Sequence, residues 1–177
     1  MKALTAFRAD GSLNVVVESP RGATTKFKYD AALDAIVLSR PLPSGLVYPH
    51  DWGFVPLTRA SDGDPVDAMI VWDGVCYPGV VVACRPLGLL KVEQTSLVTG
   101  TRERNDRLAV LPVKAPRQED VLTVFDLSER TRKELEQFFV AASAFEGKDL
   151  KILGWGDVDD ARAFIRASLV EPDTHGG

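Results

Sequence analysis

The sequence has few features that would place the protein in a membrane or outside the cell. Its only cysteines are Cys76 and Cys84. Neither has a second cysteine or a histidine at metal-ligand spacing, so we interpret both as reduced structural thiols. No apolar run approaches the roughly 20 residues of a transmembrane helix. The N-terminus lacks the basic start and long apolar stretch of a signal peptide, so we expect a cytoplasmic protein without membrane contact.

Positive charge is also scarce. The 21 Lys and Arg residues are outnumbered by 25 Asp and Glu residues, which gives a formal net charge of −4. A nucleic-acid-binding surface needs a basic face, so this balance opposes nucleic acid as a partner. It does not exclude small anionic substrates, because a few clustered cations or bound metal ions can reverse the local field.

What the chain does contain is typical of one globular domain. With 177 residues, 45% hydrophobic and 26% charged, it is long enough to bury a core and too apolar to be disordered. No internal repeat divides it. We therefore predict a single domain over residues 1–177, with a frayed tail at 170–177.

Short apolar or alternating runs fill the first two thirds of the chain, separated by Pro and Gly, as expected of a barrel or sandwich. The last third changes to helical spacing. There, Asp126-Leu-Ser-Glu129 predicts a capping box before a helix that carries Leu135, Phe138, Phe139, Ala142 and Phe145 and ends at Gly147. A second helix is predicted from Asp157. The strands are predicted at 13–18, 25–29, 35–38, 68–72, 80–84, 87–92, 108–111 and 150–155.

The segment Asp62-Gly-Asp-Pro-Val-Asp67 concentrates three acids in six residues. Alternate side chains of an extended segment share a face, so Asp62 and Asp64 can converge. Their mutual repulsion is usually relieved by a cation, and oxygen ligands suit Mg²⁺, Mn²⁺ or Ca²⁺. The alternative is a plain Asp-Gly turn between strands. An EF-hand is excluded, because Asp67 stands where that loop needs a glycine.

Three motifs in order carry a resemblance to a known family. Tyr48-Pro-His-Asp-Trp-Gly53, the acidic segment 62–67, and Arg85-Pro-Leu-Gly-Leu-Leu-Lys91 together resemble the soluble (type I) inorganic pyrophosphatases. The resemblance extends from about residue 13 to 168. It implies a mainly β, α+β fold: a five-stranded OB-like barrel with two C-terminal helices packed on the outside. It also implies a homo-oligomer, often a hexamer in bacteria, and Mg²⁺-dependent hydrolysis of pyrophosphate. The oxygen ligands of the acidic segment leave Mn²⁺ open as an alternative to Mg²⁺.

The same resemblance assigns roles to individual residues. Asp62 and Asp67 would hold metal, and Asp64 would orient the attacking water as the catalytic acid–base group. The neighbouring Asp106 is predicted as a further metal ligand, provided that a bulge turns it inward. The predicted substrate-binding residues are Glu18, Lys26, Arg40, Tyr48 and Arg107.

Several positions depart from the family pattern. Lys28 replaces a Glu near the metals, and Trp52 replaces a Tyr whose hydroxyl could bind phosphate. The other changes are Gln94-Thr95 for an acidic pair, Asn105-Asp-Arg107 for Asp-x-Lys, an extra stretch at 96–104, and Ala142-Ser143 for Tyr-Lys. The nearby acids that could compensate are Glu93, Glu103 and Asp106.

Two functions therefore stay open at the level of sequence. The retained acids favour a working metal-dependent pyrophosphatase whose activity is reduced by the altered site. The substitutions favour a catalytically degenerate relative that acts as a binding or regulatory partner. A third reading, an OB-type binder of single-stranded nucleic acid, is opposed by the acidic charge balance.

Overall fold

Five strands close into a ring at the centre of the molecule. The computed structural model describes residues 4–171. Around the ring, each strand pairs with the next and the last pairs with the first, in the order β1 (Leu13–Ser19), β4 (Asp51–Val55), β5 (Val66–Ile70), β8 (Arg107–Pro112) and β6 (Val81–Thr95). The β5–β8 pair is parallel and the others are antiparallel. This closed ring confirms the predicted five-stranded OB-like architecture.

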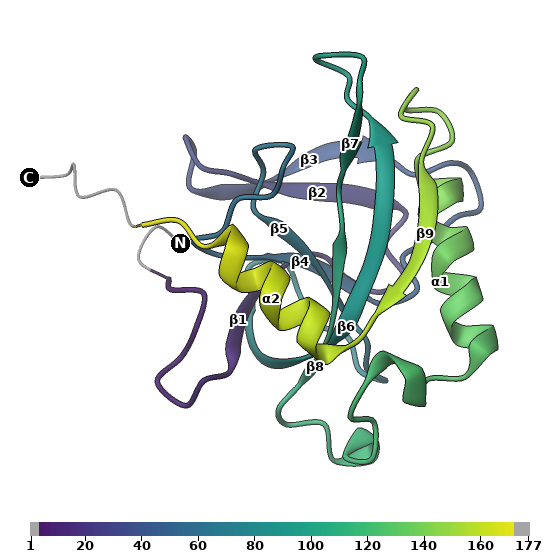
Figure 1. Cartoon of the computed structure of the whole chain (residues 1–177). Helices are drawn as coiled ribbons and strands as arrows, with labels where there is room; N and C mark the ends of the chain where they lie inside the picture. Colours follow the sequence, from purple (N-terminus) through teal and green to yellow (C-terminus); the bar gives the residue numbers. More distant parts are fainter. Residues whose placement is uncertain (1–3, 172–177) are drawn as a thin grey trace, which may run out of the picture.

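Four further strands in residues 4–171 lie outside this ring. The hairpin of β2 (Thr25–Asp30) and β3 (Ala35–Pro41) forms a separate two-stranded sheet. Strands β7 (Arg102–Arg104) and β9 (Lys151–Gly156) both pair with β6. Figure 1 shows the β6–β7 hairpin projecting beyond the rest of the molecule. Two short 3₁₀ helices, η1 (Pro116–Gln118) and η2 (Val124–Asp126), connect β8 to the helical part.

The predicted strands are all present, but two of them form one strand and two other strands were not predicted. The segments 80–84 and 87–92 were predicted as two strands, but they form the single 15-residue β6. Its register with β8 shifts between Pro86 and Gly88, and a bulge at this point accommodates a proline that cannot donate to the ladder. Strands β4 and β7 were not predicted. In β4, a Cβ on Gly53 would lie 1.9 Å from the Val16 carbonyl oxygen, so the close approach of β1 requires glycine.

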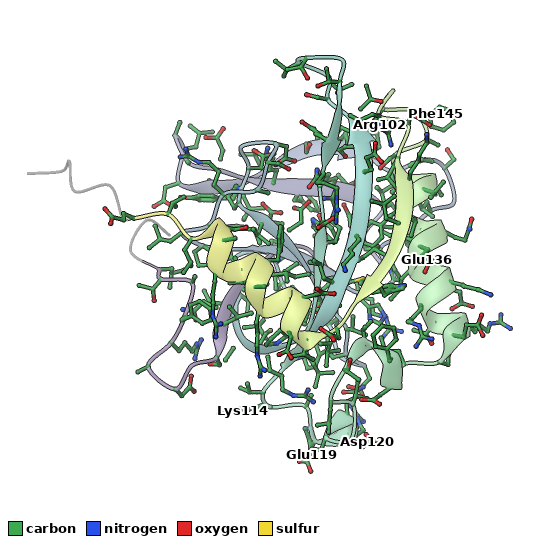
Figure 2. The ribbon with its side chains drawn as sticks, in the orientation of Figure 1. Arg102, Lys114, Glu119, Asp120, Glu136 and Phe145 are labelled. Carbon is green, nitrogen blue, oxygen red and sulfur yellow. The ribbon has the colours of Figure 1, made fainter. Side chains whose placement is uncertain are left out.

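The first helix begins later than predicted. Helix α1 (Glu129–Ala142) is capped by Ser128, whose side chain accepts from the Thr131 N–H. Asp126 was predicted as the N-cap, but its carboxylate accepts from the Leu122 and Thr123 N–H groups and so belongs to the preceding turn. Phe145 lies beyond the end of α1 and is exposed (Figure 2), which corrects its predicted place on the apolar face.

The second helix agrees with its prediction. Helix α2 (Val158–Ser168) is capped by Asp157, which accepts from the Asp159 and Asp160 N–H groups. Just beyond it, the Val170 N–H donates to the Leu57 carbonyl. Of the tail predicted at 170–177, residues 172–177 lie outside the described range. Within residues 4–171, neither helix has the length and apolar character needed to cross a membrane.

Both faces of the ring strands are covered. Leu108 and Val110 pack with α2, whereas Ala109 and Leu111, one residue out of phase on the same strand, pack with α1. The two helices lie on different flanks of the sheet (Figure 1). The predicted packing of two C-terminal helices on the outside of the barrel is thereby confirmed. The helix residues most buried in these contacts are Leu135, Phe138 and Phe139 of α1 and Ala161 and Ile165 of α2.

Candidate active site

The acidic segment forms the connection between β4 and β5. Asp62 and Asp64 flank Gly63, which has φ of +86°, a conformation that glycine adopts without strain. The Asp62 carboxylate accepts from the Asp64 N–H at 3.2 Å, so the turn is held by its own first acid. Asp67 follows as the second residue of β5. The turn and the strand start thus hold the three carboxylates at one end of the barrel.

All three acids line a single cavity, which we call the acid cavity. Glu18 of β1, Lys26 and Lys28 of β2, and Arg107 of β8 reach it from other strands. The structure therefore brings together residues that are up to 130 positions apart in the chain. The complete lining is Glu18, Lys26, Lys28, Phe54, Asp62, Asp64, Pro65, Asp67, Asn105, Arg107 and Lys148.

Each acid of the segment has a hydrogen-bond or ion-pair donor as its partner. These contacts join Asp62 to the Asn105 amide (2.7 Å), Asp64 to the Lys28 ammonium (2.7 Å) and Asp67 to the Arg107 guanidinium (3.3 Å). In residues 4–171, no three His, Cys, Asp or Glu side chains are grouped so as to hold a metal ion. Each of the three acids therefore pairs with a different side chain, and the three are not joined around one shared point.

A second cavity adjoins the first and is lined by equally many Lys and Arg residues but by fewer acids. It shares Lys26, Asp67, Arg107 and Lys148 with the acid cavity, so the two form a continuous site. We call it the cationic cavity. Arg40 of β3 and Tyr48, both predicted to bind substrate, lie here. Its complete lining is Lys26, Arg40, Tyr48, Trp52, Asp67, Gln94, Arg107, Phe138, Phe139, Ala142, Ser143, Glu146 and Lys148.

The cations are crowded where the two cavities meet. Burial lowers the pKa of Lys26; Asp67 opposes this effect, while Arg107, Lys148 and Arg40 lower the pKa further. A charged ammonium in such surroundings is stabilised by any anion that enters. The meeting point of the two cavities therefore has the electrostatics of an anion site.

The pKa values of two acids in the site are raised, whereas that of Lys26 is lowered. Burial raises the pKa of Glu18 to about 7, and the charge of Asp67 adds to this effect against the hydrogen bond from the Tyr29 N–H. Burial also raises the pKa of Asp62, with contributions from Asp67 and Asp64. Such shifts are reversed by a cation. The site thus favours a cation beside its acids and an anion beside its lysines and arginines.

The raised pKa of Glu18 predicts a dependence of stability on pH. The unfolded chain releases this proton near pH 4.5 and the folded chain near pH 7. Between these values the folded state binds more protons, so the free energy of unfolding falls as pH rises. Urea unfolding in EDTA should show the wild type losing roughly 1–3 kcal/mol more than Glu18→Gln over this window. Parallel profiles for the two proteins would contradict the assignment.

Asp106 is placed differently from the other predicted ligands. Its carboxylate accepts three hydrogen bonds from Arg104, at 2.7, 2.9 and 3.1 Å, and one from the Val92 N–H at 2.8 Å. Among the described residues it is not part of the lining of either cavity. It lies just before β8, one residue out of phase with Arg107. Its metal-binding role stays a prediction, and these contacts hold it in the sheet instead.

The other two candidate compensating acids differ in their positions. Glu93 is paired with Arg102 at 2.6 Å. Glu103 accepts from the Gln94 amide at 3.1 Å and lines a recess that also contains Asp62 and Asp64. Of the two, Glu103 is the acid adjacent to the predicted metal ligands.

Two residues of the site were missed by sequence reasoning. Lys148 lines both cavities, and Glu146 forms ion pairs with Arg40 and, at 3.2 Å, with Lys148. Arg40 also donates to the Ala142 carbonyl at 3.1 Å. Glu146 and Lys148 lie in the short connection between α1 and β9, where charged residues usually face solvent. No local pattern in the sequence distinguishes them from such surface charges.

The ligand atoms that line the acid cavity are of the type that binds a hard divalent cation such as Mg²⁺. The acid cavity offers carboxylate oxygens from Asp62, Asp64 and Asp67, and none of the described residues that line it carries sulfur or imidazole. A cation there would compete with Lys28 for Asp64. Such a site is therefore weaker than one whose acids are free.

The chain matches known proteins over most of its length. The family described as inorganic pyrophosphatase matches residues 15–171. The inorganic pyrophosphatase of Nostoc sp. is 36% identical over 159 residues, 90% of each chain. That of Thermus thermophilus is 36% identical over 167 residues, 92% of this chain and 91% of the relative.

Solved structures agree with the sequence matches. The crystal structure of the Thermus thermophilus inorganic pyrophosphatase superimposes with a TM-score of 0.85 at 34% identity, covering 94% of this chain and 95% of the other. The inorganic pyrophosphatase of Coxiella burnetii has a TM-score of 0.84 at 29% identity, covering 93% and 97%. Together with the closed five-stranded ring and the acidic segment between β4 and β5, these matches establish that the chain belongs to the inorganic pyrophosphatase family.

Proposed function

We propose that this protein hydrolyses inorganic pyrophosphate to two phosphates in a reaction that depends on a divalent metal ion, Mg²⁺ or, as a second choice, Mn²⁺. The observation that carries the proposal is the junction of two cavities, one lined by Asp62, Asp64 and Asp67 and the other by cations, in a chain of this family. Such a junction suits an anion that carries bound metal. The reaction adds one water and breaks one bridging P–O bond.

In this proposal the acids divide the work of activating water. Asp62 and Asp67 would hold the metal, which would lower the pKa of a bound water and offset phosphate charge. Asp64 holds the attacking water and accepts its proton, as a positioned carboxylate can. The ion pair with Lys28 occupies one oxygen of Asp64, which leaves the other to accept from the water.

The cations bind the substrate. Lys26 and Arg107 belong to both cavities, so each can contact a phosphoryl group and stabilise the charge that develops on it. Arg40 and Tyr48 reach the outer phosphoryl group, where Glu146 offsets part of the charge of Arg40. Because Lys28, Gln94 and Asn105 replace acids that hold further metals in the family, we expect reduced activity.

The direct test measures phosphate release from pyrophosphate by the purified protein. We expect slow turnover with Mg²⁺ or Mn²⁺ and none with EDTA. The absence of turnover with either metal, in protein that is folded by circular dichroism, would reject hydrolysis. That result would favour the alternative of a degenerate relative that binds a partner.

The cytoplasmic location and the homo-oligomeric, hexamer-like assembly belong to the same proposal. They are supported by the family membership. Light scattering of the purified protein measures the assembly directly, and a monomer at micromolar concentration would reject it.

Removal of the Lys28 ammonium should strengthen metal binding. Lys28→Met frees Asp64 and removes a like charge from the metal, so we expect about tenfold tighter Mg²⁺ binding. Titration calorimetry measures the affinity. Lys133→Met, which breaks an exposed pair with Glu129, is the matched control and should leave the affinity unchanged. Equal affinity in Lys28→Met and wild type would show that Lys28 does not oppose the metal.

Asp62→Asn should abolish the rise in melting temperature on adding metal.

A further inference from the structure

The three tryptophans differ in how their indole N–H groups are satisfied. Trp72 donates to Asp51 at 2.9 Å, and Trp155 of β9 donates at 2.7 Å to Glu136, which lies on α1 (Figure 2). Trp52 is 4% exposed, and its indole nitrogen is buried without a hydrogen-bond partner among the described residues. A buried donor without a partner destabilises the protein, and native proteins seldom contain one without a reason.

The Trp52 ring is held by its neighbours. The Tyr48 ring centroid lies 6.4 Å from it and that of Phe139 lies 5.3 Å from it. The Arg107 guanidinium carbon lies 5.9 Å from the Trp52 centroid. Rotation of the indole toward another acceptor would disrupt this packing, so the N–H stays in its present environment.

That environment is the cationic cavity. Trp52 lines it together with Lys26, Arg40 and Arg107, three side chains that only donate hydrogen bonds. Asp67, Gln94 and Glu146 also line this cavity and can accept, but none of them accepts from the Trp52 N–H among the described residues. An additional donor there is satisfied by a ligand that offers several acceptor oxygens. A phosphoryl group is such a ligand, whereas a single water would have to accept from Trp52 while facing the same cations.

We propose that the Trp52 indole N–H donates a hydrogen bond to a phosphoryl oxygen of the bound substrate. This inference rests on the proposed function and deepens it by adding a substrate-binding residue. The indole nitrogen thereby takes over the donor role whose loss was expected when a tyrosine was replaced. Because the indole N–H only donates, the contact favours an ionised phosphoryl oxygen, which is a stronger acceptor than a protonated one.

The first test follows the indole N–H groups by ¹⁵N–¹H NMR while methylenediphosphonate, a diphosphate analogue that is not hydrolysed, is added with Mg²⁺. The Trp52 signal is assigned with Trp52→Phe. We expect it to move downfield, toward the position of a hydrogen-bonded indole, while the Trp72 and Trp155 signals, whose N–H groups already have partners, stay in place. A Trp52 signal that does not move at saturating analogue overturns the proposal.

The second test separates the N–H group from the ring. Site-specific replacement of Trp52 by benzothienylalanine keeps the bicyclic shape and substitutes sulfur for the N–H. Analogue binding should weaken about tenfold, the loss expected for one hydrogen bond to a charged group. The same replacement at Trp155 breaks only the contact with Glu136 and should leave analogue affinity unchanged. Unaltered affinity after replacement at Trp52 overturns the proposal.

The two proposals fail in distinguishable ways. Binding of the analogue requires no turnover, so a shifted Trp52 signal in a protein that hydrolyses no pyrophosphate rejects the hydrolase function and supports the Trp52 contact. Turnover of pyrophosphate with an unmoved Trp52 signal supports the function and rejects the contact.

Discussion

Asp64→Asn is expected to lower the rate of pyrophosphate hydrolysis by roughly 100- to 10,000-fold, the usual contribution of a positioned general base. The amide keeps the shape of the side chain but cannot accept the proton of the attacking water. Phosphate release at saturating Mg²⁺ measures the effect. The loss should appear in kcat, since Asp64 acts on the water rather than on the phosphoryl groups.

The control for this variant is Asp120→Asn. Asp120 is exposed and lies at the end of the molecule opposite the β6–β7 hairpin that carries Arg102 (Figure 2). The control should retain wild-type activity. Equal rates in wild type and Asp64→Asn would identify the activity as a contaminant or assign the proton transfer to another group.

Arg107→Met is expected to reduce kcat by roughly 100- to 1,000-fold, as removal of one preorganised donor to developing charge typically does. Arg107 is 8% exposed, pairs with Asp67 at 3.3 Å and belongs to both cavities. Methionine preserves the length of the apolar stem and removes every donor. Steady-state kinetics with pyrophosphate give kcat and KM separately.

A conservative variant distinguishes catalysis from folding at this position. Arg107→Lys keeps the positive charge beside Asp67 and should recover much of the lost rate, although a lysine cannot donate two parallel hydrogen bonds to one phosphoryl group. Thermal unfolding of both variants monitors structural loss. If Arg107→Met stays within about threefold of wild type, Arg107 has no part in stabilising the reaction.

The elements predicted best were those with complete local signals. Helix α2 has a capping aspartate and apolar residues at helical spacing, and it begins where expected. Strand β4 was missed because all five of its residues are buried and no alternation marks it. The start of α1 was misplaced because Asp126 and Ser128 both offer capping chemistry, and the 3₁₀ turn η2 takes the first of them.

The three acids of segment 62–67 line one cavity because they are close in the sequence, while their metal-binding and catalytic roles stay predictions. Asp62, Asp64 and Asp67 lie within one turn and the start of one strand, so their grouping needs little more than local geometry. The Lys28–Asp64 pair joins residues 36 positions apart, and Arg40 meets Glu146 from 106 positions away. These contacts depend on how the β2–β3 hairpin and the α1–β9 connection are placed against the ring. No local pattern encodes that placement.

The amino-acid sequence by itself determined the strand-rich chain, the acidic turn and the family. Each of these depends on residues that interact with near neighbours or recur in a fixed order. The tertiary structure alone decided which donor faces each acid, that Lys148 lines both cavities, and that the Trp52 N–H has no partner within residues 4–171. The physical reason is that hydrogen bonds and ion pairs act over a few ångströms in space, and closure of the ring brings together side chains that are distant in sequence.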